Sequence, residues 1–257
     1  MAARGVLVTR PAGQGDVLCE GIDARGFSAH QLPLLALEPL PELPAAERSR
    51  VLALDEFQHI IFISANAVRF GMAVIENYWP QLPLGLNWYA VGDGTARALA
   101  AFGVTAQTPG QDMTSEGLLA LPGLRSCDGE RVLLVKGEGG RDALARELAT
   151  RGARVETLAC YRRVAPALTP EDFAAALARW DIGFIMISSG EGLANMLALL
   201  GPEETSKLRD VRLFLPSARV AAAATAAGFR QCLIADNASD NAMLRALDTW
   251  VADTGDK

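Results

Sequence analysis

Short apolar runs alternate with helical segments along nearly the whole chain, and this alternation is the strongest constraint on the fold. Each run is followed by a polar or glycine-bearing loop and then a helical stretch, several of which end at a glycine such as Gly26, Gly103 or Gly228. The pattern is typical of strand–loop–helix units in a parallel α/β sheet. The runs interpreted as buried strands are residues 5–9, 59–63, 88–91, 132–135, 183–187 and 211–215.

Two segments fit neither a central strand nor a helix, and we interpret them as connections between two domains. A second strand, predicted at residues 28–37, is followed by the proline-rich stretch 38–44, where prolines remove backbone donors. The segment 165–170 has a similar character. Two connections imply that the chain leaves its first domain and later returns to it.

An internal repeat indicates two similar α/β halves. Three features recur at nearly one spacing of about 125 residues. They are Val6-Leu7-Val8 with Val132-Leu133-Leu134, Ile63-Ser64 with Ile187-Ser188, and the alanine-rich helices that end at Gly103 and Gly228. The chain is therefore predicted to hold two copies of one α/β unit. The repeat alone would divide the chain near residue 127.

Composition limits the classes of function. The chain has 257 residues and a formal net charge of −6, which argues against a nucleic-acid binder, because such proteins show a basic stripe. The sequence has no apolar run long enough to span a membrane and no signal-like segment, so we expect a cytoplasmic protein. Four scattered cysteines and the distant His30 and His59 predict neither disulfides nor a metal site, and we expect both histidines to be structural.

Polar loops follow the predicted strands, and parallel sheets bind ligands at that edge. The loop from Lys136 to Arg141 is rich in glycine and precedes a helix, so free backbone N–H groups would favour an anion there. The loop matches neither a dinucleotide fingerprint, since Asp142 stands where the third glycine should be, nor a Walker motif. An ordinary glycine-bearing turn is the alternative interpretation of this loop.

The loops offer hydroxyls, backbone amides and a few guanidinium groups, but no histidine, no cysteine with a base and no carboxylate pair. Covalent or metal chemistry is therefore disfavoured, and the predicted ligand is a polyanion bound largely by backbone donors. Ser64, Ser188, Ser217 and Thr95 are also good helix N-caps. That structural role would itself aim the N–H groups of a helix start at the ligand.

Position-specific pieces over nearly the whole chain resemble uroporphyrinogen-III synthases. Each piece is weak alone, and their common order carries the resemblance. The pieces are Val8-Thr9-Arg10-Pro11, residues 61–68, residues 90–96, residues 139–144, Cys160-Tyr161-Arg162-Arg163, Ile187-Ser188-Ser189-Gly190 and residues 216–220. Enzymes of this family close linear hydroxymethylbilane into uroporphyrinogen III, with loss of water and inversion of ring D.

The resemblance implies an α/β fold of two flavodoxin-like lobes with parallel sheets, which exchange their first segment and are joined by two crossings. One lobe would hold residues 1–37 with 166–257, and the other residues 38–165. The resemblance also implies a cytoplasmic, monomeric enzyme of tetrapyrrole biosynthesis that needs no cofactor. Its partner would be the small molecule hydroxymethylbilane, with transient hand-over from the preceding enzyme of the pathway, and neither nucleic acid nor membrane is expected as a partner.

The family's tyrosine corresponds to Tyr161, whose phenol O–H can donate to the leaving hydroxyl. A packing role is the alternative for Tyr161, and a capping role is the alternative for Thr95, which matches a substrate-site threonine of the family. No metal ligand is expected. The residues expected to bind substrate are Arg10, Ser64, Ala65, Asn66, Gly92, Thr95, Lys136, Gly137, Arg141, Ser188, Ser189, Ser217 and Arg219.

Two other classes of protein compete with this interpretation. A non-catalytic two-lobed binding protein for an organic anion would show the same loops, and only the family pieces, chiefly Tyr161, separate it from the enzyme. A nucleotide-dependent transferase is disfavoured by the incomplete glycine fingerprint.

Overall fold

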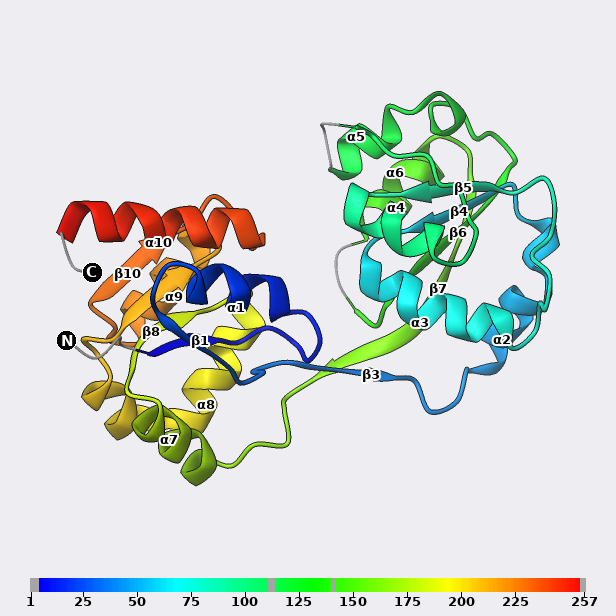
Figure 1. The fold of residues 1–257 in the computed structure, drawn as a ribbon. Coiled ribbons are helices and arrows are strands. Elements are labelled where there is room, and N and C mark those ends of the chain that lie inside the picture. Colours follow the sequence, from blue (N-terminus) through cyan, green and yellow to red (C-terminus); the bar gives the residue numbers. More distant parts are fainter. Residues whose placement is uncertain (1–4, 111–113, 140–141, 255–257) are drawn as a thin grey trace. The chain divides into compact units, whose positions relative to one another are not determined.

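The structure is a computed structural model that describes residues 5–110, 114–139 and 142–254. The chain forms two compact units (Figure 1). The two-segment unit comprises Met1–Ala36 and Val164–Lys257, and the central unit comprises Leu37–Arg163. The chain therefore passes between the units twice, close to the boundaries predicted after residues 37 and 165. Within the described ranges, no helix is long and apolar enough to cross a membrane.

The two-segment unit has a sheet of strand order β10-β9-β8-β1-β2, and its paired strands are parallel. Numbered within the unit along the chain, this is the 2-1-3-4-5 order of flavodoxin-like folds, which bind ligands where the order reverses, here between β1 and β8. The strands are β1 (Gly5–Val8), β2 (Ser28–Gln31), β8 (Ile182–Met186), β9 (Arg212–Leu215) and β10 (Gln231–Ile234). The helices are α1 (Asp16–Asp23), α7 (Pro170–Arg179), α8 (Gly190–Lys207), α9 (Ala218–Ala226) and α10 (Asp240–Thr254).

Alternate residues of β1 pack against opposite faces of this sheet. Val6 and Val8 are buried with side chains of α1 and α10, whereas Leu7 is buried with those of α7, α8 and α9. Full burial of such a side chain contributes roughly 1.5–3 kcal/mol. Because helices cover both faces, the strand is a continuous apolar run rather than an alternating one.

The central unit has a sheet of strand order β3-β7-β6-β4-β5, in which β5, β4, β6 and β7 pair in parallel. Taken as strands 2, 1, 3 and 4 of the unit, β5, β4, β6 and β7 follow the same flavodoxin-like order, and β3 takes the place of strand 5. The strand order therefore reverses between β4 and β6. The strands are β3 (Ala36–Pro39), β4 (His59–Phe62), β5 (Asn87–Ala90), β6 (Arg131–Gly137) and β7 (Arg154–Val164). The helices are α2 (Ala45–Leu52), η1 (Leu54–Glu56), α3 (Ala65–Glu76), α4 (Asp93–Ala100), α5 (Ser115–Leu119), η2 (Pro122–Leu124) and α6 (Ala143–Thr150).

The predicted α/β class with parallel sheets is confirmed, but the strand expected at residues 28–37 is wrong. It is two strands, because β2 belongs to the sheet of the two-segment unit and β3 to that of the central unit. Pro33 lies between them and cannot donate to a ladder. Pro39 ends β3 instead of breaking it, since β3 is an edge strand. The passage between the sheets therefore runs through residues 32–35 and not through the proline-rich stretch.

The internal repeat does not mark the two units. It pairs β1 with β6 and β4 with β8, and in each pair the two strands lie in different sheets at different places in the strand order. The structural equivalent of β1 is β4, and that of β8 is β6. Every β–α step of a parallel sheet has a similar sequence, so a repeat of apolar runs and terminal glycines does not identify which steps share a sheet.

Candidate functional site

In the central unit, the start of α3 lies at the carboxyl end of β4, next to the reversal of strand order. Ser64 is the N-cap, and its hydroxyl accepts a hydrogen bond from the Ala67 amide at 3.1 Å, as predicted. Ala65 and Asn66 form the first turn of this 12-residue helix. Free N–H groups and the helix dipole favour an anion at such a helix start.

Tyr161 lies in β7 and is 1% exposed. Its ring stacks on Phe70 of α3, with 5.0 Å between the ring centroids. It also lies against Gly137, the last residue of β6, where a Cβ atom would be only 2.6 Å from Tyr161 Cζ. No described residue hydrogen-bonds the Tyr161 hydroxyl, and its oxygen is not among the fully buried polar atoms that lack a partner. The contacts hold the ring in place and leave its oxygen available to donate.

Phe70 is the neighbour of Tyr161 that the sequence did not single out. Phe70 is 8% exposed, and the guanidinium of Arg69 lies 4.5 Å from its ring centroid. The Arg69 guanidinium contacts the Phe70 ring, and the Phe70 ring stacks on Tyr161. One ring therefore separates this cation from the phenol. The signal in the sequence was weak, because an aromatic residue on an apolar helix face is usually part of a core.

Lys136 has a partner within the predicted anion loop. Its Nζ lies 2.9 Å from Asp142 Oδ1, and the Lys136 side chain is 12% exposed. The Lys136 ammonium, through a hydrogen bond and its charge, holds the pKa of the Asp142 carboxyl below its ordinary value. The positive charge of Lys136 is thus already compensated by Asp142. Arg141, the other predicted cation of the loop, lies outside the described residues.

The loop after β5 begins α4 one residue after Gly92, which is the N-cap. The alternative interpretation of Thr95, as the N-cap of this helix, is wrong, because Thr95 is the third residue of α4 and is 6% exposed. The amide of Thr95 donates to the Gly92 carbonyl at 3.0 Å. Gly92 and Thr95 thus lie at the carboxyl end of β5, the strand next to β4.

In the two-segment unit, α8 and α9 begin at the carboxyl ends of the neighbouring strands β8 and β9. The cap of α8 is Ser189, whose hydroxyl accepts from the Gly192 amide at 3.0 Å, so the predicted capping role of Ser188 is wrong by one residue. Ser217 is the N-cap of α9 as predicted, with a long bond of 3.5 Å from the Val220 amide. Arg219 is exposed, and its Nη1 would lie 3.9 Å from a Cβ on Gly190. The two helix starts and this guanidinium form one polar edge.

Arg10 also has partners inside its own unit. Its Nη1 lies 2.7 Å from Asp240 Oδ1, an ion pair without hydrogen-bond alignment, and its Nη2 donates to the Ala238 carbonyl at 2.5 Å. The Arg10 side chain is 14% exposed. Arg10 therefore ties the loop after β1 to the start of α10.

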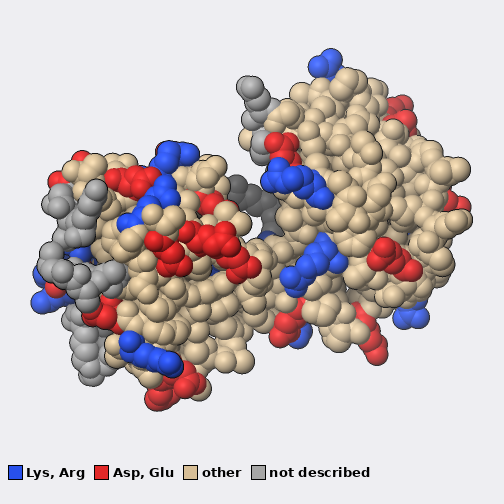
Figure 2. Space-filling view, in the orientation of Figure 1, with Lys and Arg blue, Asp and Glu red and all other residues tan. Residues whose placement is uncertain are grey.

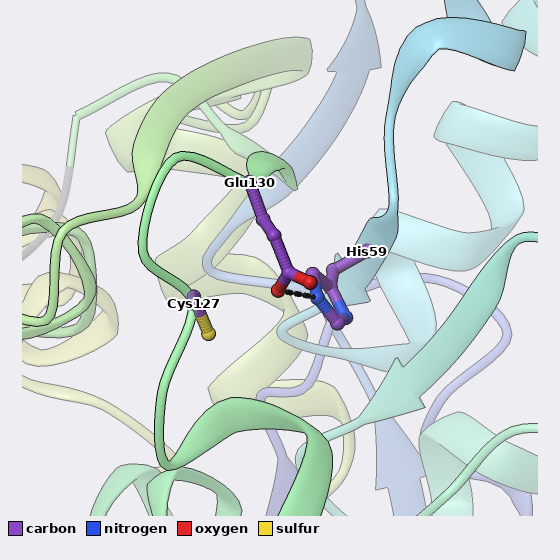
Figure 3. A group of neighbouring side chains, drawn as sticks. All are labelled: His59, Cys127 and Glu130. Carbon is purple, nitrogen blue, oxygen red and sulfur yellow. Dashed lines mark hydrogen bonds and ion pairs between the residues drawn. The ribbon is translucent and has the colours of Figure 1, made fainter.

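A second polar cluster lies at the other end of the central sheet (Figure 3). His59 begins β4 and is 3% exposed; its Nε2 is 2.7 Å from Glu130 Oε2, and its Nδ1 is 3.2 Å from the Tyr89 hydroxyl. One ligand atom each from His59, Cys127 and Glu130 lie within 4.8 Å of one another. Burial, with the charge of Glu130 adding to it, raises the pKa of the Cys127 thiol. His59 and Cys127, which are far apart in the sequence, therefore lie close together in the fold.

Figure 2 shows mixed charge on the face of the molecule that it draws. On the face shown in Figure 2, the coloured acidic and basic side chains of the described residues are interspersed and form no continuous basic stripe. This agrees with the net charge of −6. The positive elements of the candidate site are helix starts and single guanidinium groups.

These features define a class: an α/β protein of two units with flavodoxin-like strand order, in which helix starts gather at the carboxyl edge of each sheet. The family model for uroporphyrinogen-III synthase HemD matches residues 16–245. The chain is 33% identical to uroporphyrinogen-III synthase of Escherichia coli K12 over 251 residues, which is 94% of this chain and 99% of that protein. It is 34% identical to the enzyme of Salmonella typhimurium LT2 over 248 residues, again 94% of this chain and 99% of that protein.

Solved structures show the same fold. Uroporphyrinogen-III synthetase from Helicobacter pylori 26695 matches with a TM-score of 0.62 at 16% identity, covering 96% of this chain and 99% of that one. A mutant uroporphyrinogen III synthase from the extremely thermophilic bacterium Thermus thermophilus matches with a TM-score of 0.56 at 21% identity, covering 98% of this chain and 100% of that one. The chain belongs to the uroporphyrinogen-III synthase family.

Proposed function

We propose that this chain closes hydroxymethylbilane into uroporphyrinogen III, with loss of water and inversion of ring D, and that Tyr161 is the acid for departure of the hydroxyl. Membership of the family supports the reaction. The position of Tyr161 supports the assignment of the acid, because its ring is held by Phe70 and Gly137 and its hydroxyl lacks a partner among the described residues. That placement is the observation on which the residue assignment depends.

The proton balance is simple in this scheme. Tyr161 Oη donates its proton as the C–O bond of the terminal hydroxymethyl group breaks, so water leaves, Tyr161 is left as the phenolate, and an electrophilic azafulvenium cation that keeps its pyrrole N–H forms. Ring D then closes through its substituted position to a spiro intermediate, which fragments and closes again with the ring inverted. The re-formed pyrrole releases one proton, which restores the phenol. A positioned acid typically contributes about 10²–10⁴-fold, and positioning of the substrate contributes further.

The helix starts are proposed to hold the substrate's carboxylates. Backbone N–H groups at Ser64, Ala65 and Asn66 suit this role, as they are at the start of a capped 12-residue helix. Arg10 and Lys136 have carboxylate partners of their own, so we propose that they fix loops. The remaining proposed substrate-binding residues are Gly92, Thr95, Arg141, Ser188, Ser189, Ser217 and Arg219. Gly137, expected from the sequence to bind substrate, is instead proposed to position the ring of Tyr161.

The proposal includes a cofactor-free, monomeric and cytoplasmic enzyme, with hand-over of substrate from the preceding enzyme. The test is to supply freshly made hydroxymethylbilane to purified protein after dialysis against EDTA and to separate the oxidised products by isomer. We expect the type III isomer to predominate. Formation of the type I isomer alone, at the rate without protein, would refute the proposed reaction. Activity that appears only when a small cofactor is returned would refute the cofactor-free scheme.

A further inference from the structure

The cluster of His59, Cys127 and Glu130 combines three kinds of metal ligand in the central unit, with His59 and Cys127 buried and Glu130 partly exposed (Figure 3). Cys127 and Glu130 are brought together by a tight turn, in which the Glu130 amide donates to the Cys127 carbonyl at 3.0 Å. His59 approaches from the first residue of β4, the strand that pairs with β6 directly after this turn. The fold thus assembles the three donors from two segments far apart in the sequence.

The donors suit a borderline or soft divalent ion. Thiolate and imidazole select Zn²⁺ or Co²⁺ over Mg²⁺ and Ca²⁺, and a carboxylate is a common third ligand. The Tyr89 hydroxyl lies 3.2 Å from His59 Nδ1, the ring nitrogen opposite the one that faces Glu130, so it can hold the imidazole in place. Tyr89 is fully buried, so its hydroxyl is already fixed beside the cluster.

Among the three ligand atoms, Cys127 Sγ has the weakest existing interaction. Its hydrogen bond to the Gly123 carbonyl is 3.7 Å long, whereas both nitrogens of His59 have close partners. The ligand atoms lie within 4.8 Å of one another. Ligands of a tetrahedral zinc ion, at about 2.0–2.3 Å from it, are roughly 3.5 Å apart, so a closure of about 1 Å is sufficient.

We propose that His59, Cys127 and Glu130 form a binding site for one Zn²⁺-type divalent ion. On binding, the Cys127 S–H bond breaks, a metal–sulfur bond forms, and the thiol proton is released to water. The proton between His59 Nε2 and Glu130 Oε2 moves to His59 Nδ1, which then donates to the Tyr89 hydroxyl. The Glu130 side chain is 41% exposed and gives the ion a route from solvent. The ion links the turn before β6 to the start of β4.

The place of the site indicates a structural role. Ser64, at the proposed catalytic edge, lies five residues from His59 along an extended strand, which corresponds to about 16 Å. The ion is therefore too distant to act on the substrate. Its binding should raise the thermal stability of the chain and leave turnover unchanged.

Co²⁺ is the probe for the test, because a cobalt–thiolate bond has a charge-transfer absorption that carboxylate and imidazole alone do not produce. Reduced, chelator-treated full-length protein is titrated with Co²⁺ at about pH 8, where thiolate formation is easier. We expect the band to saturate at one equivalent in the parent protein. It should persist in the control variant Cys232→Ser, whose sulfur lies in the other unit, and be lost in Cys127→Ser.

Two further measurements keep the test decisive if Cys127→Ser fails to fold. Glu130→Gln replaces a partly exposed carboxylate ligand, so the variant should fold. It should bind Co²⁺ at least about tenfold more weakly than the parent protein, by analogy with the losses of affinity seen when metal sites are altered. Zn²⁺ should raise the melting temperature of the parent protein and of Cys232→Ser alike. Absence of the band in the parent protein, an unchanged band in Cys127→Ser, or full affinity in Glu130→Gln would each overturn the proposal.

Discussion

Replacement of Gly137 by alanine tests whether the close contact with Tyr161 matters for turnover. The new methyl group would lie 2.6 Å from Tyr161 Cζ, whereas non-bonded carbons prefer about 3.5–4.0 Å. The ring must therefore shift by roughly 1 Å against Phe70 and the surrounding core. Overpacking of this kind costs about 1–3 kcal/mol of stability, and a 1 Å misplacement at a reacting group can lower turnover by about 10²-fold.

A double-mutant cycle separates the loss of stability from the loss of turnover. Phenylalanine keeps Cζ, so Gly137→Ala should destabilise the parent protein and Tyr161→Phe equally in chemical denaturation. Turnover should fall about 10²-fold in the parent background and change little in the Tyr161→Phe background, because the hydroxyl that Gly137 positions is absent there. Val132→Ala, a core change at the other end of β6, is the control for lost stability without lost turnover.

Two outcomes would contradict this reasoning. An equal loss of turnover in both backgrounds would mean that Gly137 acts on the substrate or the fold and not through the phenol. Unchanged turnover in Gly137→Ala would mean that the placement of Tyr161 is unimportant.

Three further predictions concern the caps and ion pairs. Ser189→Ala should lower the free energy of unfolding by about 1 kcal/mol and Ser188→Ala by much less; equal losses would contradict the assignment of the cap. Arg10→Gln should cost about 1.5–3 kcal/mol of stability with an unchanged KM, and a raised KM with unchanged stability would assign Arg10 to substrate binding. Lys136→Met should raise the pKa of Asp142 toward its ordinary value, measured by NMR titration. Because Lys136 lowers that pKa, the pair stabilises the fold above the ordinary carboxyl pKa and loses its effect as pH falls through the lowered value.

The class of fold followed from the sequence because a parallel sheet covered on both faces needs continuous apolar strands, such as Val6-Leu7-Val8, and each crossover needs a helix. One strand was predicted at residues 28–37, where the structure has β2 in one sheet and β3 in the other. Pro33, which lies between them, was a signal for this break. The sheet membership of each strand could not be predicted from the repeat, because strand pairing depends on the whole topology and each β–α step has a similar sequence.

The candidate site was predictable to the level of loops. Helix starts after β4 and β9 were found with their caps, Ser64 and Ser217, because capping depends on local chemistry. Register errors of one residue, as at Ser189, arise because neighbouring serines cap equally well on local grounds. The stacking of Phe70 on Tyr161 depends on long-range packing, which no local pattern encodes.

The same limit applies to partners that are distant in sequence. The ion pair of Arg10 with Asp240 joins the two ends of the chain, so the sequence could not show that this guanidinium is occupied. The approach of His59 to Cys127 and Glu130 depends on the pairing of β4 with β6, which the sequence also did not reveal.

The turnover of Tyr161→Phe is the most direct test of the central claim, that Tyr161 donates the proton to the leaving hydroxyl. Phenylalanine keeps the ring that stacks on Phe70, so the fold should be retained, as checked by circular dichroism. We expect turnover of freshly made hydroxymethylbilane to fall about 10²-fold, at the low end for a positioned acid because water can replace the lost donor in part. A correctly folded Tyr161→Phe protein that forms the type III isomer at the parent rate would show that Tyr161 is a packing residue and not the acid.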